Sequence, residues 1–529
     1  MSEKQLLKAE NIVVRFGEQE ILHFDRMSVY EGERVGLVGA NGAGKTTLLR
    51  VLAGELVPEN GRVERFCEMG FFHQFGEREK PQTEDEAALP LAFQYGMEAW
   101  DGREVKEFKV KEKLWQKAVS GGEDVRIRLA QIFGSRKPLL LLDEPTSNLD
   151  MAGISVLTER LGHIETMILV SHDRSLLNAV CTRIVEIEDG GLKSYDGNYD
   201  SYVQCRKAAR ERQQLEYEQY RKEKSRLEKV YLAKKEKAAA IEKRPRGMSA
   251  HEANVLAFIG NHKPEDKARN MERSARNVKK RLEHMEVKEK PKETVRIRPE
   301  FRLYDAPENP ILIEGEHLTF SYDGERKLFE DAGFAIQNKS RVAIVGENGA
   351  GKTTLLHLIA DSVQEKQKLP LEGGKIRVVP KARLGLLEQN LSMLAPEKTV
   401  LENVMEQSIF KEDLARTILA RLLLSEKDLN KKVQMLSGGE RIKLAFARLF
   451  VDNVNVLVLD EPTNYLDIAS MEALEQMFSV YEGTLVFVSH DEAFIRAVAT
   501  EILIVEDGKI RAFRGTPEEY FSFKQSIPL

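Results

Sequence analysis

Cysteines and long apolar runs are scarce in this chain of 529 residues. The three cysteines, Cys67, Cys181 and Cys205, lie too far apart for a CxxC zinc or redox pair, and their odd number suits a reducing compartment. The longest apolar runs, such as residues 139–142, are far shorter than the roughly 18 residues that span a bilayer. The first residues form no signal-peptide core. We therefore expect a cytoplasmic protein that neither crosses a membrane nor is exported.

Charge is distributed unevenly along the chain. The formal net charge is −5, yet residues 201–300 hold 28 Lys and Arg against 16 Asp and Glu. A basic segment between two acidic bodies indicates a polyanionic partner. Nucleic acid is favoured over an anionic membrane, because a membrane surface would also require an amphipathic apolar stripe.

Two long blocks of the sequence match each other in order and spacing, which indicates a tandem duplication. Each block contains a glycine-rich loop followed by Ser-Gly-Gly-Glu, Asp-Glu-Pro-Thr and Ser-His-Asp. These motifs begin at Gly39, Ser120, Asp143 and Ser171 in the first block, and at Gly346, Ser437, Asp460 and Ser489 in the second. Short apolar runs before the Asp and the His predict strands buried in a parallel sheet, so each block is expected to be an α/β domain.

Both glycine-rich loops match GxxxxGK[ST], a pattern that binds nucleotide phosphates. Its glycines bring backbone N–H groups close to phosphate oxygens, and the positive end of the following helix points to the same place. The lysine is placed to reach the outer phosphates, and the next threonine to ligate Mg²⁺. The predicted phosphate-binding residues are Gly39, Asn41, Gly42, Gly44, Lys45, Thr46 and Thr47, and Gly346, Asn348, Gly349, Gly351, Lys352, Thr353 and Thr354.

Paired carboxylates follow the next buried strand of each block. Asp143 and Asp460 are placed to hold the hydration shell of Mg²⁺. Glu144 and Glu461 come next, where each can orient or deprotonate an attacking water. The alternative for such an Asp-Glu pair is a helix cap.

The order of phosphate loop, Gln, SGGE, DEPT, LD and SHD resembles the nucleotide-binding domains of ATP-binding cassette (ABC) proteins, over about residues 5–200 and 310–525. In that family two domains face head to tail, and each ATP lies between the phosphate loop of one domain and the SGGE helix of the other. The resemblance implies two shared ATP sites, one containing Lys45, Glu144, Ser437 and Gly439 and the other containing Lys352, Glu461, Ser120 and Gly122.

The same resemblance assigns further roles to pairs of residues. These are the adenine-stacking Phe16 and Tyr322, the metal- and water-contacting Gln74 and Gln389, the catalytic switch histidines His172 and His490 at the γ-phosphate, and Asp150 and Asp467 in the loop that couples the sites. Core packing is the alternative for the two aromatic residues. The first SGGE motif, called the signature, is flanked by Val119 and Asp124, where the family usually has Leu and a basic residue. The two sites could therefore hydrolyse ATP at unequal rates.

ABC domains serve transporters, repair machines and translation factors, so the intervening segment must discriminate among these functions. Spacings of three and four over residues 217–241 and 268–285 predict two helices that pair as an antiparallel coiled-coil hairpin. Pro245 and Gly247 break the first helix, and Pro264 opens the second. The expected architecture is α/β, with two tandem ABC-type P-loop ATPase domains, residues 1–200 and 301–529, joined by a long helical hairpin, residues 201–300.

The predicted tip of the hairpin, residues 242–263, mixes cations with an apolar run. Cations contact phosphates, and an exposed aromatic side chain can stack on a base. The alternative is that the apolar residues cap the core of the hairpin. The candidate ribosome-contacting residues of this tip are Lys243, Arg244, Arg246, Val255, Leu256 and Phe258.

Tandem ABC domains around a charged hairpin, with residues 195–202 (YDGNYDSY) leading into it, resemble the ABC-F translation factors. The short region between Gln74 and Ser120 and the extended tip resemble the antibiotic-resistance branch, the Vga- and Vml-like ribosome protection proteins. The resemblance implies a monomer with an intramolecular ATPase dimer that uses ATP and Mg²⁺ and binds the E site of the 70S ribosome, beside 23S rRNA and the P-site tRNA. There the tip would remodel the peptidyl-transferase centre and displace lincosamides, streptogramin A compounds and pleuromutilins.

Three alternatives stay open at this stage. A housekeeping ABC-F factor would rescue stalled ribosomes without a drug. The fused ATPase pair of a sugar importer would need a membrane permease but no basic hairpin of 100 residues. A DNA repair or chromosome ATPase would need a much longer coiled coil or zinc-binding cysteines. We therefore expect neither a membrane permease nor DNA as a partner.

Overall fold

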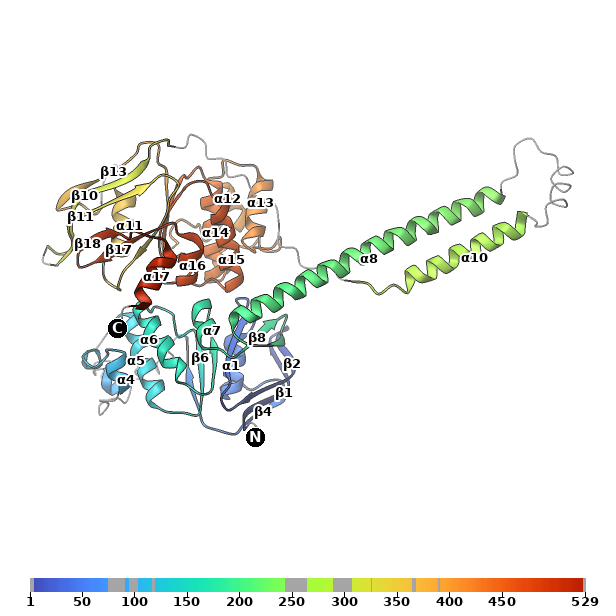
Figure 1. Ribbon diagram of the computed structural model, residues 1–529, viewed down its shortest axis with the longest axis horizontal. Coiled ribbons are helices and arrows are strands. Elements are labelled where there is room, and N and C mark those ends of the chain that lie inside the picture. The colour runs from blue at the N-terminus through green and yellow to red at the C-terminus, as the bar shows by residue number, and fades with distance from the viewer. Residues whose placement is uncertain are drawn as a thin grey trace. The chain divides into compact units, whose positions relative to one another are not determined.

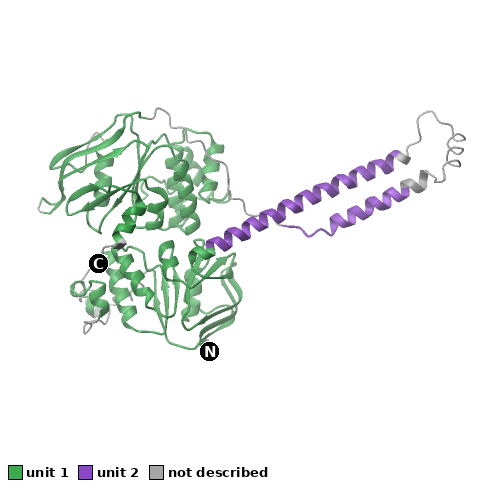
Figure 2. Cartoon of the chain, in the orientation of Figure 1, with its two compact units in different colours: residues 1–202, 295–529 green, residues 203–294 purple. Residues whose placement is uncertain are grey.

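The structure is a computed structural model that describes residues 4–74, 91–94, 103–116, 119–242, 264–288, 307–324, 326–363, 368–388 and 391–526. It divides into two compact units, one formed by residues 1–202 and 295–529 and the other by residues 203–294 (Figure 2). The first unit holds both copies of the sequence repeat. The candidate tip residues Lys243, Arg244, Arg246, Val255, Leu256 and Phe258 lie outside the described residues, as does Gln389.

Each copy of the repeat contains a six-stranded sheet whose first five strands are parallel (Figure 1). The order is β5-β6-β7-β3-β8-β9 in the first copy and β14-β15-β16-β12-β17-β18 in the second. The strands of the first sheet are β3 (Arg34–Gly39), β5 (Met69–Phe72), β6 (Leu139–Asp143), β7 (Met167–Val170), β8 (Arg183–Glu188) and β9 (Gly191–Asp196). Those of the second are β12 (Arg341–Val345), β14 (Leu384–Leu387), β15 (Val456–Asp460), β16 (Thr484–Val488), β17 (Glu501–Glu506) and β18 (Lys509–Ala512).

A smaller antiparallel sheet completes each copy, with the order β2-β1-β4 in the first and β11-β10-β13 in the second. Its strands are β1 (Gln5–Phe16), β2 (Gln19–Tyr30), β4 (Asn60–Arg65), β10 (Ile311–Ser321), β11 (Lys327–Gln337) and β13 (Gly373–Val378). The two copies thus share one topology, and the α/β fold and the tandem duplication predicted from the motifs are both confirmed.

Helices cover the larger sheets. In the first copy they are α1 (Lys45–Ala53), α3 (Leu91–Gln94), α4 (Arg103–Glu107), the 3-10 turn η1 (Lys113–Trp115), α5 (Gly121–Gly134), α6 (Met151–Gly162) and α7 (Arg174–Val180). In the second they are α11 (Lys352–Asp361), α12 (Val400–Met405), α13 (Glu412–Arg421), the 3-10 turn η2 (Val433–Met435), α14 (Gly438–Val451), α15 (Ile468–Val480), α16 (Glu492–Val498) and α17 (Pro517–Ser526).

The central strands separate two hydrophobic cores in each copy. All five residues of β6 are buried. Since side chains alternate along a strand, Leu139 and Leu141 enter the core that contains α1 and the small sheet, whereas Leu140 and Leu142 enter the core that contains α5 and α6. The apolar run predicted as a doubly covered strand therefore has that environment. It also fixes where Asp143, the last residue of the strand, emerges.

The second unit contains α10 (Pro264–Glu283) and all but the first four residues of α8 (Tyr199–Glu242), which belong to the first unit. They run antiparallel, because Lys234 bonds Ser274 while Glu223, earlier in α8, lies 3.9 Å from Arg281, later in α10. The predicted apolar spacing marks their contact, where Leu227, Ala238 and Ala275 are buried. Lys224, which the spacing also places at this contact, is exposed. Among the described residues, no helix has both the length and the apolar content needed to cross a membrane.

Candidate nucleotide-binding sites

The glycine-rich loops join the central strand of each sheet to the helix that follows. Gly44 and Gly351 precede α1 and α11 in the left-handed backbone region, with φ of 98° and 102°. A Cβ at these positions would come within 2.9 Å of Ile21 and Leu328, so only glycine fits without displacing its neighbours. This turn leaves the first N–H groups of each helix available for an anion.

The loop lysines are buried and held by their own loops. Lys45 Nζ donates to the carbonyl oxygens of Gly39 and Ala40, at 2.8 and 3.1 Å, and Lys352 makes the equivalent two contacts at 2.9 Å each. Burial lowers the pKa of both ammonium groups, although nearby carboxylates oppose this effect. A phosphate entering the loop would add negative charge beside these buried ammonium groups.

A hydroxyl and a carboxylate stand together beside each loop. Thr46 Oγ1 donates to Asp143 Oδ2 at 2.7 Å, and Thr353 Oγ1 donates to Asp460 Oδ1 at 3.1 Å. The other oxygen of Asp143, Oδ1, is buried and has no hydrogen-bond partner within the described part of the chain. Hard oxygen donors of this kind, one of them unsatisfied, fit Mg²⁺. Gln74, just beyond β5, lines the cavity described below.

The glutamates that follow β6 and β15 adopt an unusual backbone. Glu144 and Glu461 have φ of 49° and 48°, a region that costs energy for a residue with a side chain and that is found at functional sites. Neither glutamate nor the preceding Asp caps a helix, because Asp150 caps α6 and Asp467 caps α15. The helix-cap alternative is therefore wrong.

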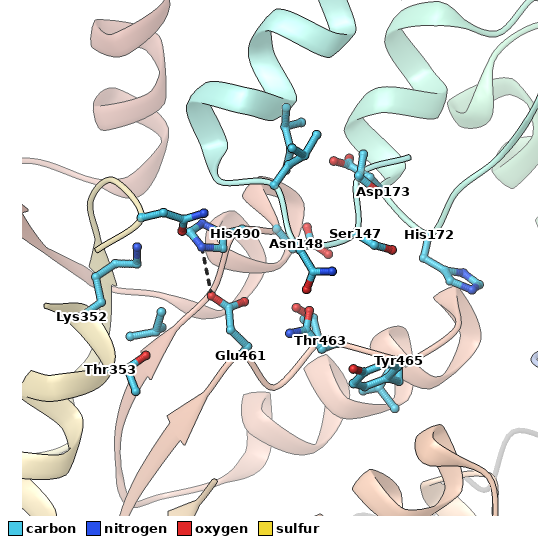
Figure 3. A pocket seen from close by; sticks show the side chains of 18 of the residues that line it. Ser147, Asn148, His172, Asp173, Lys352, Thr353, Glu461, Thr463, Tyr465 and His490 are labelled. Carbon is cyan, nitrogen blue, oxygen red and sulfur yellow. Dashed lines mark ion pairs between the residues drawn. The ribbon is translucent and has the colours of Figure 1, made fainter. Parts of the chain in front are cut away.

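Each of these glutamates meets a histidine. His172 Nε2 lies 3.3 Å from Glu144 Oε1. His490 Nε2 likewise lies 3.3 Å from Glu461 Oε1, as the dashed line in Figure 3 marks. Burial raises the pKa of both carboxyl groups to about 7. It lowers the pKa of His172 to about 3 and that of His490 to about 4, so both imidazoles are neutral. A carboxylate with a pKa near neutrality is well matched to act as a general base.

The serine of each SGGE signature motif is the N-cap of the helix that follows. Ser120 caps α5 and Ser437 caps α14, each in a capping box with the Glu three residues later. Gly122 and Gly439 approach the opposite half closely. A Cβ on Gly439 would lie 3.0 Å from Nδ2 of Asn41, and one on Gly122 would lie 3.6 Å from Nδ2 of Asn348. Each phosphate loop thus faces the signature helix of the other half.

Hydrogen bonds between the halves reinforce this arrangement. The N–H of Asn41 donates to Asp467 Oδ2 at 2.8 Å, and the N–H of Asn348 donates to Asp150 Oδ2 at 3.3 Å. Burial disfavours the charge on both aspartates, yet hydrogen bonds and nearby cations hold their pKa values below the usual range. The residues predicted to couple the two sites therefore contact the opposite phosphate loop directly.

The two predicted adenine-stacking residues are exposed, Phe16 by 56% and Tyr322 by 67%. Core packing is therefore wrong for both. The hydroxyl of Tyr322 lies 3.0 Å from Thr354 Oγ1, which orients its ring. Both rings are available to pack against a flat ligand.

A cavity of about 610 Å³ lies at the second site and extends to Gln74, Glu144 and His172, which are predicted for the first site. Residues of both halves surround it, as Figure 3 shows for Asn148 and His172 from the first half and for Lys352, Glu461 and His490 from the second. Most of the polar groups predicted for the second site line this cavity.

Sequence reasoning missed Asn148 and Tyr465, which precede the Leu-Asp of each LD motif. Both have positive φ, 63° and 64°. Their carbonyl oxygens would lie 2.5 and 2.6 Å from a Cβ on the signature glycine of the same half. Tyr465 O also accepts from Asn41 Nδ2 at 2.7 Å. The sequence signal that could have identified them is their equivalent position in the two copies, directly before the Leu-Asp of each LD motif.

Comparisons with known proteins agree with this geometry. The ABC transporter family model matches residues 22–147 and 329–464. The chain is 33% identical to the erythromycin resistance ATP-binding protein MsrA of Staphylococcus epidermidis, over 94% of this chain and 97% of that protein. It is 32% identical to the ribosome protection protein VmlR of Bacillus subtilis, over 96% and 88%, and 30% identical to the probable ATP-binding protein YbiT of Escherichia coli O157:H7, over 98% and 99%.

The fold also matches a solved structure. The RNase-L inhibitor aligns with a TM-score of 0.63 at 18% identity, over 97% of this chain and 93% of that one. At this level of identity the match concerns the fold alone. It covers both ATPase halves.

Proposed function

The chain belongs to the ABC-F family of ATP-binding cassette proteins, and we propose that it binds the ribosome and protects it from antibiotics. The family membership confirms the resemblance on which the sequence interpretation was built. Its paired ABC domains make the chain an ATPase, which converts ATP and water to ADP and phosphate.

One observation carries the proposal. The similarity to VmlR and MsrA extends over 96% and 94% of this chain, so it includes the helical unit as well as the ATPase domains. VmlR is named for ribosome protection and MsrA for erythromycin resistance. The net positive charge of residues 201–300 suits a ribonucleic acid partner.

We assign the ATP chemistry to the two shared sites. The phosphate loops and signature helices would hold the triphosphate, and Glu144 and Glu461 would each accept a proton from the attacking water. Mg²⁺, held by Thr46, Gln74 and Asp143 in the first site and by Thr353, Gln389 and Asp460 in the second, would neutralise phosphate charge. His172 and His490, being neutral, would each contact the γ-phosphate as a hydrogen-bond donor.

The proposed cycle of ATP binding and hydrolysis depends on the fact that both halves contribute residues to each site. Since each site takes residues from both halves, ATP binding favours the associated form of the halves, and hydrolysis removes that preference. We propose that the associated form fits the ribosomal E site. The hairpin tip then acts on the peptidyl-transferase centre, beside 23S rRNA and the P-site tRNA, and displaces lincosamides, streptogramin A compounds and pleuromutilins.

Drug susceptibility tests the proposal. A sensitive Gram-positive host would express either this chain or its Glu144→Gln/Glu461→Gln variant. Both would be assayed against lincomycin, a pleuromutilin, a streptogramin A and erythromycin, the last because of the relative MsrA. We expect a raised inhibitory concentration for at least one class with the unmodified chain only. An unchanged concentration for all four drugs would contradict the resistance function.

The second candidate is a housekeeping ABC-F factor that rescues stalled ribosomes without a drug. The similarity to YbiT, whose name carries no resistance function, covers 99% of that protein and favours this candidate. ATP-dependent sedimentation with ribosomes, combined with unchanged drug susceptibility, would support it over the resistance function.

A further inference from the structure

One ion pair between the ATPase halves does not follow the symmetry of the repeat. Arg174, the first residue of α7, bonds Glu475 on α15 through Nη2, and its Nη1 lies 3.4 Å from Glu475 Oε2. The two side chains are only 15% and 17% exposed. A forked contact of this kind between largely buried groups depends strongly on geometry.

Both partners are connected to residues of the first site, although Arg174 also faces Asp491, which lines the cavity at the second site. Arg174 lies two residues after His172, which contacts Glu144. Glu475 lies on the helix whose cap, Asp467, accepts from the phosphate loop at Asn41. The pair therefore joins the segment that follows His172 in the first half to helix α15 of the second half, whose N-cap Asp467 reaches the same site.

The equivalent positions at the second site carry different chemistry. In the repeat, Glu492 is the position equivalent to Arg174, and Thr158 is the position equivalent to Glu475. Glu492 pairs instead with Arg496 in its own helix, at 2.7 Å. Within the described ranges, no ion pair joins Glu492 to the first half.

The surroundings of Arg174 are acidic. Arg174 faces Asp491 as well as Glu475, and Asp173 faces Asp491 and Glu492. Burial, together with the charge of Asp491, raises the pKa of Asp173 to about 6. Loss of the guanidinium would leave these carboxylates facing one another across the interface. Loss of Glu475 would leave Arg174 with Asp491 as a partner.

The helix that carries Arg174 also holds the start of α8. Asn178 Nδ2 donates to Asp200 Oδ2 at 2.8 Å, and the N–H of Asp200 donates back to Asn178 Oδ1 at 3.0 Å. The short helix α7 therefore contacts both the second half and the first turn of α8.

We propose that Arg174 is a positioning residue whose ion pair with Glu475 holds the two halves together at the first ATP site and slows release of the nucleotide there. The second site, without such a pair, releases its nucleotide sooner. The inference rests on the two ATP sites proposed above. It explains how two sites with equivalent motifs can act unequally.

Release of a fluorescent ATP analogue, chased with excess ATP, tests each site by itself. All chains would carry Glu144→Gln/Glu461→Gln to prevent hydrolysis. Lys352→Ala would then restrict binding to the first site, and Lys45→Ala to the second. We expect slower release from the first site. Arg174→Gln should accelerate that release about tenfold or more, with less than about a twofold change at the second site. Glu475→Gln should have the smaller effect of the two.

Three further variants separate positioning from folding. The reversed pair Arg174→Glu/Glu475→Arg should restore slow release at the first site. Glu492→Gln, the matched control at the equivalent position, should leave release from both sites unchanged. Thr158→Glu/Glu492→Arg, which introduces the missing pair, should slow release from the second site. Equal acceleration at both sites by Arg174→Gln, or no acceleration at either, would overturn the inference while leaving ATP binding itself established.

Discussion

Among single residues, the two glutamates that follow β6 and β15 have the environment most relevant to hydrolysis. Their sequence position indicated a general base, but not the left-handed backbone that turns each side chain toward a histidine. Nor did the sequence indicate how far burial would raise their pKa values, because burial depends on residues from other elements.

The pH dependence of hydrolysis should report this environment. A general base works only when it is ionised, and burial raises the pKa of Glu144 and Glu461 to about 7. We expect kcat/KM for ATP to be constant in mild alkali and to fall about tenfold per pH unit well below pH 7. Hydrolysis measured at constant ionic strength, with nucleotide binding followed in parallel, checks this. A flat profile between about pH 5.5 and 7 would contradict it.

Gly439 allows a second test at the same scale. A Cβ there would lie 2.6 Å from the carbonyl oxygen of Tyr465 and 3.0 Å from Asn41 Nδ2 in the opposite half. Gly439→Ala should therefore displace the signature helix from the first phosphate loop and lower ATP turnover, about tenfold or more, since small displacements of positioning groups are costly.

The matched control is its neighbour. At Gly438 a Cβ would meet nothing closer than 3.9 Å, so Gly438→Ala should turn over ATP at a nearly unchanged rate. Equal turnover in the two variants, measured by phosphate release, would show that the close approach of Gly439 has no functional consequence.

Among the elements, the helices α8 and α10 were predicted from apolar spacing, with Pro245, Gly247 and Pro264 marking their ends, and both form. The spacing worked because side chains three and four residues apart share one face of a helix. Lys224 departs from it and is exposed beside Tyr220, with its ammonium 5.9 Å from the ring centre. A long stem allows a lysine at a seam to reach solvent.

Leu227 should be central to this pairing of helices. It is buried, whereas Leu232 on the same helix is exposed. Leu227→Ala should destabilise the hairpin by about 2 kcal/mol or more, and Leu232→Ala by less than about 0.5 kcal/mol. Hydrogen exchange of the α8 amides in the full chain measures this. Faster exchange in both variants to the same extent would contradict the assignment of the seam.

For the whole molecule, the important feature is that each phosphate loop is completed by the opposite half. Hydrogen bonds from Asn41 to Asp467 and from Asn348 to Asp150 connect residues far apart in the sequence. We therefore propose that hydrolysis at either site is linked to the association of the halves.

Blocking hydrolysis should therefore hold the molecule in its ATP form. The Glu144→Gln/Glu461→Gln variant, with ATP, should remain bound to 70S ribosomes through sedimentation, whereas the unmodified chain should be released as it turns over. Glutamine preserves size and hydrogen bonding but cannot accept the proton. Rapid release of the double variant from ribosomes would contradict the proposed cycle.

The sequence by itself determined the duplication, the α/β class, the buried strands and the helical hairpin, because each depends on motifs or periodicities within contiguous residues. It also showed in which order the phosphate loop and the paired carboxylates follow one another along each half. Only the tertiary structure decided that Asn148 and Tyr465 support the signature glycines, and that, among the described residues, Arg174 pairs with Glu475 with no equivalent pair between Thr158 and Glu492. These contacts join residues separated by up to several hundred positions, and no local pattern encodes which partners the packed halves bring together.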